Sequence, residues 1–145
     1  MKLKKLFLAA GLTAAATVSV TAQKAPEPCG LTPSARQIEW YNREMIAFFH
    51  FGINTFEDFV NEGDGKASTA IFNPAALDCE QWMQTLKSAG IPAAILTAKH
   101  ADGFCLWPSK LTNYTVALSP YRNGKGDIVG ELSRSCAKYG LKFGI

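Results

Sequence analysis

Three short apolar runs, separated by long loops and helical patterns, place the strongest constraint on the fold. The runs cover residues 45–52, 91–98 and 141–145 and lack the alternation of a half-exposed strand. Largely apolar runs of this length are typical of strands buried on both faces of a parallel sheet. Pro92 stands near the start of the second run, where no ladder hydrogen bond is needed.

Helical patterns lie between these runs. Asn73 and Pro74 predict a helix start, because Asn is a favoured cap and Pro a favoured first helical residue, and Gly90 predicts the end. Asp127 and Gly140 bracket the next helix in the same way. The order strand, long loop, helix, strand, long loop, helix, strand predicts an α/β fold with a parallel sheet and right-handed crossovers.

The domain plan has three parts. Residues 1–22 have a basic start, an apolar stretch and a small-residue cleavage site, and they predict a secretory signal peptide. A membrane anchor is the alternative, but the apolar stretch is short for a span of about 20 residues. Residues 23–44 form a lead-in and a short helix over 34–43, in which Trp40 and Tyr41 are expected to pack inward. Residues 45–145 hold the sheet, and the final apolar run suggests a longer protein cut short.

Charge and cysteine content narrow the function. The chain has 15 Lys and Arg against 12 Asp and Glu, and the excess is Lys2, Lys4 and Lys5 in the signal. The exported part is therefore neutral, and we expect no nucleic-acid partner because the excess of basic residues that such a partner requires is missing. We also expect no membrane span once the signal is cleaved. The four cysteines match no zinc spacing, and we expect those at positions 79, 105 and 136 to be single buried thiols.

The two histidines of the chain are the main candidates for a site. His50 lies at the end of the first apolar run and His100 at the end of the second. The carboxyl ends of parallel strands share one edge of the sheet, and neighbouring strands lie about 5 Å apart, so both side chains can reach one pocket. Imidazoles donate and accept hydrogen bonds in fixed directions, which suits the hydroxyls of a sugar.

A metal site is the alternative interpretation of the histidine pair. Asp58, Glu62 and Asp102 are the acidic residues near it, but metal sites usually need three or more ligands at defined spacing, and no such spacing occurs. We therefore expect neither a metal nor another cofactor. Trp107, in the second long loop, is a candidate to stack on a sugar ring. A pair of catalytic carboxylates, the signature of a glycosidase, is not evident.

Several spaced motifs occur along the chain in a fixed order. They are His50-Phe-Gly-Ile-Asn-Thr-Phe, Gly63-Asp-Gly, Phe72-Asn-Pro, Leu96-Thr-Ala-Lys-His-Ala-Asp-Gly-Phe-Cys-Leu-Trp-Pro-Ser109 and Gly124-Lys-Gly-Asp127. Together they resemble the start of an α-L-fucosidase of glycoside hydrolase family 29. The resemblance covers residues 31–145 and is nearest to the branch that prefers α-1,3 and α-1,4 linked fucose.

The resemblance implies an exported, exo-acting enzyme that removes terminal fucose from glycans with retention. It implies the N-terminal part of a (β/α)8 barrel of the TIM type, with about three strands present. An Asp nucleophile and a carboxylate acid/base are expected after Ile145, so the chain alone should be inactive. His50 and His100 match fucose-binding histidines, and Glu62 and Trp107 are further candidates for substrate contact.

Two positions depart from the family pattern. Ala101 replaces the second histidine of the Lys-His-His-Asp-Gly-Phe motif, and Asn61-Glu62 stands where many relatives have Glu-Trp. These losses keep a second hypothesis open, namely a non-catalytic sugar-binding relative. A third is an unrelated secreted α/β binding protein.

Overall fold

The computed structural model describes residues 24–57 and 63–145. The chain divides into two units, Met1–Thr32 and Pro33–Ile145, and all helices and strands of the described part belong to the second. None of the described helices is long and apolar enough to cross a membrane.

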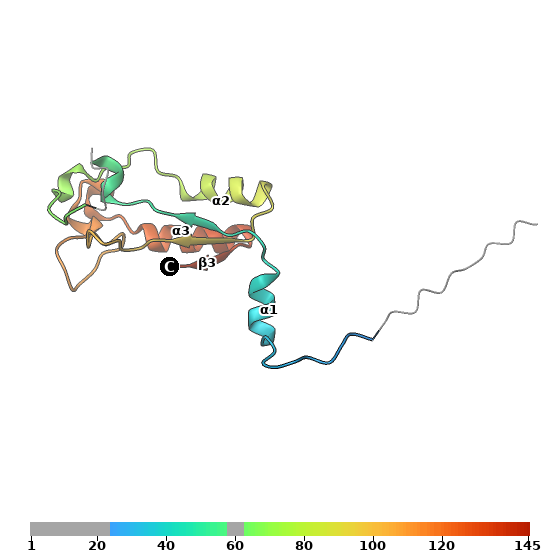
Figure 1. Ribbon diagram of the computed structural model, residues 1–145. Coiled ribbons are helices and arrows are strands. Elements are labelled where there is room, and N and C mark those ends of the chain that lie inside the picture. Colours follow the sequence, from blue (N-terminus) through green and yellow to red (C-terminus); the bar gives the residue numbers. More distant parts are fainter. Residues whose placement is uncertain (1–23, 58–62) are drawn as a thin grey trace, which may run out of the picture. The chain divides into compact units, whose positions relative to one another are not determined.

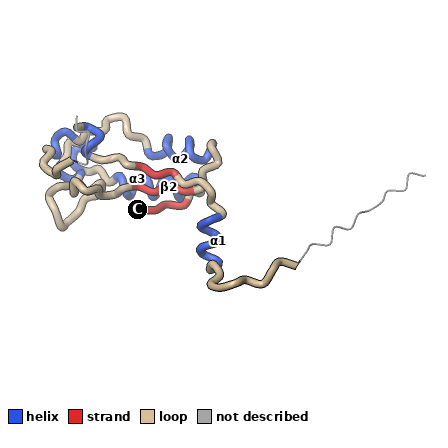
Figure 2. Tube along the Cα trace, in the orientation of Figure 1, coloured by secondary structure: helices blue, strands red, loops and turns tan. Residues whose placement is uncertain are grey.

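Three parallel strands form the sheet, in the order in which they occur along the chain (Figures 1 and 2). They are β1 (Ala47–Phe49), β2 (Ala93–Leu96) and β3 (Lys142–Gly144). Ala94 pairs with Ala47 on one side and with Phe143 on the other. The predicted parallel α/β arrangement is therefore confirmed, and each strand lies inside its predicted apolar run.

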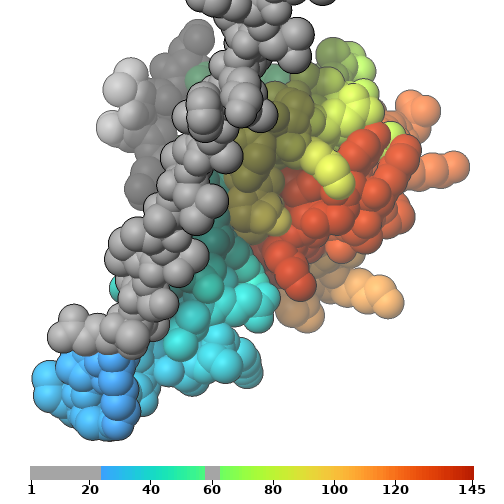
Figure 3. All heavy atoms as spheres, turned by 90° about the vertical axis from the view of Figure 1, so that its right-hand side faces the viewer, coloured from blue at the N-terminus to red at the C-terminus, as the bar shows by residue number. Residues whose placement is uncertain are grey.

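Two helices pack against one face of this sheet. They are α2 (Cys79–Ser88) and α3 (Ile128–Tyr139). Phe49 of β1 stacks on Trp82 of α2 with ring centroids 4.9 Å apart. The two helices also contact each other, and the atoms of the two segments lie side by side in the space-filling view (Figure 3). An ion pair of 2.6 Å joins Lys138 of α3 to Glu80 of α2.

The opposite face of the sheet is open in this chain. Phe48, which alternates with Phe49 along β1, is 56% exposed. The prediction that the first strand is buried on both faces is therefore wrong for the described structure, because α2 covers β1 on the side of Phe49 and Phe48 on the other side is exposed.

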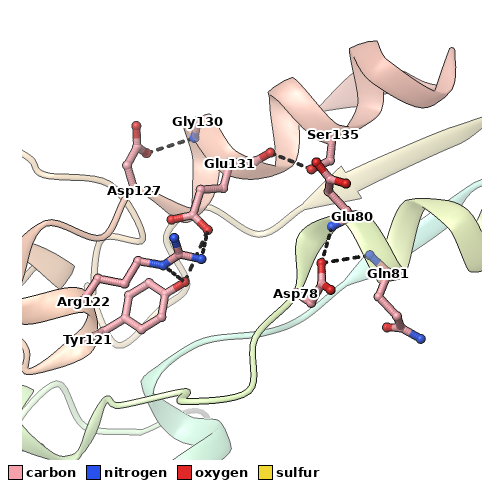
Figure 4. Close-up of polar contacts among 9 residues, drawn as sticks. All are labelled: Asp78, Glu80, Gln81, Tyr121, Arg122, Asp127, Gly130, Glu131 and Ser135. Carbon is pink, nitrogen blue, oxygen red and sulfur yellow. Dashed lines mark hydrogen bonds and ion pairs between the residues drawn. The ribbon is translucent and has the colours of Figure 1, made fainter.

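The helix boundaries follow their caps. The predicted start of α2 at Asn73 and Pro74 is wrong, because Asp78 accepts hydrogen bonds from the amides of Glu80 and Gln81 and so starts the helix five residues later (Figure 4). The residues from Asn73 to Leu77 instead form a turn.

The predicted boundaries of α3 are confirmed. Asp127 accepts from the amide of Gly130 at 2.9 Å (Figure 4). Gly140 ends the helix with φ +73°, a left-handed conformation that glycine adopts without the steric cost of a Cβ.

The short helix α1 (Ala35–Tyr41) begins at a capping box formed by Ser34 and Gln37. The helix itself was predicted, but the prediction that its aromatic residues pack inward is wrong. Trp40 is 50% exposed and Tyr41 is 80% exposed.

The core lies between the helices and the sheet and extends under the two long loops. Its fully buried side chains include Ile53, Phe72, Met83, Leu96, Phe104, Leu106, Val116, Ile128, Leu132 and Cys136. All four cysteines are unpaired, and those at positions 79, 105 and 136 are buried as predicted.

The second long loop is fixed to α3 by a small polar cluster. Arg122 and Asn123 both have positive φ, which is uncommon for residues with a Cβ. The Arg122 guanidinium donates to the Tyr121 hydroxyl and pairs with Glu131 at 2.9 Å (Figure 4). The backbone strain is thus offset by contacts that hold the end of the loop beside the start of α3.

Candidate functional site

The candidate site lies where β1 and β2 end. His50 follows β1 directly, and His100 follows β2 by four residues. Both side chains face one hollow of about 400 Å³, so the expectation that they reach a common pocket agrees with the geometry. Its lining residues are His50, Phe51, Gly52, Asn54, Thr55, Thr97, His100 and Asp102.

The two imidazoles approach each other edge to face. Their ring centroids are 5.6 Å apart and their planes meet at 77°. His50 is exposed, and its Nδ1 lies 3.2 Å from the Thr97 hydroxyl. His100 is half-buried, and its Nδ1 is buried without a hydrogen-bond partner among the described residues. Leaving a buried nitrogen without a hydrogen bond costs free energy, which a hydrogen bond to a ligand or to water would recover.

Asp102 joins the loops that follow the two strands. It is 8% exposed, and its Oδ2 accepts a hydrogen bond of 3.0 Å from the Asn54 side-chain amide. Its Oδ1 accepts from the backbone amide of Phe104 at 2.6 Å. With both oxygens engaged by protein donors, Asp102 fixes the loop of His100 to the loop of His50.

Two glycines pack their backbones against this link. Gly65 has φ +72°, and a Cβ there would lie 2.7 Å from the Asp102 carbonyl oxygen. Gly63 has φ +59°, and a Cβ there would lie 2.3 Å from Asn54 Oδ1. Both positions favour glycine for conformation, and Gly65 also requires it for space, because the atom that a Cβ would meet there belongs to the backbone. The Gly63-Asp-Gly motif thus places the first loop against the site.

Tyr114, a neighbour of the site, is partly buried among apolar side chains and lies near carboxylates. Burial raises the pKa of its phenol, and the nearby Asp102 carboxylate raises it further. The ring packs edge-on against Phe104 at 5.2 Å, and the buried hydroxyl has no partner in the described part of the chain. Tyr114 is therefore a neutral wall beside the Asp102 link.

The structure does not place Trp107 in the same hollow as the histidines. Trp107 lines a second hollow on the open face of the sheet, together with Phe48, Ile95 and Lys99. Thr97 lines both hollows, so the two adjoin. The predicted contact between Trp107 and substrate stays a prediction.

The other residues considered for substrate or metal binding do not lie in the described lining of the hollow. Glu62 and Asp58 lie outside the described residues. Ala101 is exposed in the turn after His100. Within residues 24–57 and 63–145, no group of three or more His, Cys, Asp or Glu side chains is arranged to hold a metal ion.

Sequence reasoning missed several lining residues, and Asn54 and Thr97 are the ones that bond to other site residues. Asn54 belongs to the His50-Phe-Gly-Ile-Asn motif and Thr97 interrupts an apolar run with a hydroxyl. The polar residue at the end of a buried strand was a usable signal, because polar groups in such positions need partners.

Comparison with known proteins shows which family the chain belongs to. The sequence profile of the α-L-fucosidase family matches residues 16–145. The chain belongs to the α-L-fucosidase family. It is 48% identical over 122 residues to alpha-L-fucosidase 1 of Arabidopsis thaliana, which covers 83% of this chain and 24% of the plant protein.

Solved structures agree with this family membership. A Bacteroides thetaiotaomicron protein assigned to the α-L-fucosidases is 77% identical, with a TM-score of 0.80, over 83% of this chain and 26% of that one. A Ruminococcus gnavus family 29 fucosidase in complex with fucose is 37% identical, with a TM-score of 0.73, over 84% of this chain and 25% of that one. The chain thus spans about a quarter of the length of these relatives.

Proposed function

We propose that the protein is an exo-acting, retaining α-L-fucosidase and that this chain supplies part of its fucose-binding site. The observation that carries the proposal is the meeting of His50 and His100 in one hollow at the carboxyl edge of β1 and β2. Family membership supports fucose as the ligand class of the hollow, and a structurally similar relative is known in complex with fucose.

The chemistry of the hollow suits a neutral sugar. A neutral imidazole offers one donor and one acceptor, and vicinal hydroxyls can satisfy both. The unpartnered His100 Nδ1 gains a hydrogen bond when a hydroxyl enters. Fucosylated oligosaccharides and glycoconjugates are the proposed substrates.

The bond-breaking carboxylates are proposed to lie outside this chain. Retaining glycosidases need two carboxyl groups about 5–5.5 Å apart. The described lining of the hollow contains one carboxylate, Asp102, and protein donors occupy both of its oxygens. Because the chain spans about a quarter of its relatives, catalysis is proposed for the whole protein.

The same reasoning extends to the architecture. The three parallel strands are proposed to be part of a (β/α)8 barrel, whose active sites lie at the carboxyl ends of the strands. Residues 1–22 are proposed to be a cleaved signal that directs the protein to the periplasm or the exterior, on the basis of the Lys2, Lys4 and Lys5 region and the apolar stretch after it. Glu62 and Trp107 are proposed as further substrate contacts.

Hydrolysis of 4-nitrophenyl α-L-fucopyranoside by the whole protein tests this proposal, with the β-anomer as the substrate control. We expect turnover of the α-anomer alone, and NMR should show the α-anomer of fucose as the first product. His50→Ala should lower kcat/KM at least about tenfold, the equivalent of one hydrogen bond to substrate.

Gln81→Ala, on the exposed side of α2, is the matched control and should leave kcat/KM unchanged. Fucose binding without hydrolysis would favour the non-catalytic relative. Absence of both binding and hydrolysis, in a folded protein, would contradict the proposed function.

A further inference from the structure

His50 is the exposed member of the histidine pair, and one side chain holds its Nδ1. The Thr97 hydroxyl oxygen lies 3.2 Å from that nitrogen. The backbone amide of Thr97 donates to the carbonyl of Phe49, the residue before His50, at 3.0 Å. The backbone that carries the hydroxyl is therefore fixed with respect to the backbone that carries the imidazole.

The other neighbours of the ring limit its space but make no hydrogen bond to it in the described structure. The Phe48 ring centroid lies 4.7 Å from that of His50, and the His100 centroid lies 5.6 Å away. The bond to Thr97 thus decides which nitrogen faces the hollow. With Nδ1 turned toward Thr97, Nε2 is the nitrogen available to a ligand.

The two neutral tautomers of His50 differ in which of their protons can make a hydrogen bond. A neutral imidazole carries one N–H, and the threonine hydroxyl carries one O–H. If Nδ1–H donated to the hydroxyl, the hydroxyl proton would have no acceptor among the described residues, since His50 is the only hydrogen-bond partner of the Thr97 side chain there. If the hydroxyl donates to Nδ1, the hydroxyl proton has an acceptor in the protein, and the proton without a protein partner is the one on Nε2. Thr97 is half-buried, whereas His50 is exposed and lines the hollow, so this second arrangement places the free N–H where a ligand oxygen or water can accept it.

We propose that Thr97 is a positioning residue that holds His50 as the Nε2–H tautomer, so that the imidazole presents a donor to an acceptor oxygen of the sugar. The inference rests on the proposed function only for the identity of the ligand. The tautomer itself is a property of the free protein.

Long-range ¹H–¹⁵N correlation spectra of the whole protein, labelled with ¹⁵N-histidine, test the proposal. They are recorded at a pH of about 8, above the usual range of imidazole titration. His50→Gln assigns the resonances. We expect a protonated Nε2 and an unprotonated Nδ1 in the wild type and in Thr97→Ser, and a mixture of tautomers in Thr97→Val.

Fucose affinity gives the second readout. Thr97→Val should raise the Kd for L-fucose about tenfold, or about 1.4 kcal/mol, and Thr97→Ser should restore most of the affinity. The matched control is Thr85→Val on α2, whose hydroxyl bonds to the Gln81 carbonyl at 2.9 Å. This control should change neither the spectrum of His50 nor the Kd.

A wild-type spectrum with the proton on Nδ1 would overturn the proposal, whether or not the Thr97 variants fold. An unchanged spectrum and Kd in folded Thr97→Val would overturn it as well. The Nε2–H tautomer in the wild type and a mixture of tautomers in Thr97→Val, without binding of L-fucose, would support the role of Thr97 and contradict the proposed function instead.

Discussion

The close approach of Gly65 to the Asp102 carbonyl yields a quantitative prediction. Gly65 and Gly90 have nearly the same backbone conformation, with φ +72° and φ +75°. They differ in their surroundings, because a Cβ at Gly90 would meet nothing within 4 Å, whereas a Cβ at Gly65 would lie 2.7 Å from the Asp102 oxygen. Gly90→Ala is therefore a matched control for Gly65→Ala.

The expected magnitudes follow from this difference. A left-handed residue with a Cβ costs about 1–2 kcal/mol, and the lower entropy of the unfolded alanine chain offsets part of it. Gly90→Ala should thus lower the free energy of unfolding by about 1 kcal/mol. Gly65→Ala adds a clash with a backbone atom that cannot rotate away, which costs about 1–3 kcal/mol more.

Urea unfolding of wild type and both variants measures the two losses. We expect a larger loss for Gly65→Ala than for Gly90→Ala, together with a higher Kd for L-fucose in Gly65→Ala only, since Asp102 lies two residues after His100. Equal losses of stability in the two variants would refute the packing of Gly65 against Asp102.

Three further predictions concern the framework of the site. Asp127→Ala removes the acceptor of the Gly130 amide and should lower the free energy of unfolding by about 1 kcal/mol, measured by urea denaturation; no change would refute the cap. Met83→Ala, at a fully buried position, should cost about 2–5 kcal/mol in the same assay, and a loss below about 1 kcal/mol would contradict its burial. Burial raises the pKa of the Cys79 thiol to about 11, so iodoacetamide at a pH of about 8 should label the exposed Cys29 and leave Cys79 unmodified until the protein unfolds, as peptide mapping by mass spectrometry can show.

The order of the strands and the two long helices could be predicted from the sequence, since the apolar runs and the Asp127 and Gly140 signals lie at the observed positions. The sequence misplaced the start of α2 because Asn73-Pro74 and Asp78 are both good starting signals, and only tertiary packing selects between them. It also did not reveal that Phe48 faces an open side, because burial depends on what covers the sheet.

Only part of the candidate site could be predicted from the sequence. The positions of His50 and His100 follow from strand ends, which the hydrophobic pattern locates. The links from Thr97 to His50 and from Asn54 to Asp102 join residues 47 and 48 positions apart, so they require the register of the sheet. No local pattern specifies pairs at that separation.

Calorimetric titration of the whole protein with L-fucose tests whether the hollow at His50 and His100 is a fucose-binding site, with D-fucose as the stereochemical control. We expect the wild type to bind L-fucose and not D-fucose. We also expect His50→Ala and His100→Ala each to weaken binding at least about tenfold, as for loss of a hydrogen bond to the ligand. Undiminished L-fucose affinity in both folded variants would contradict the assignment of this hollow as the fucose-binding site.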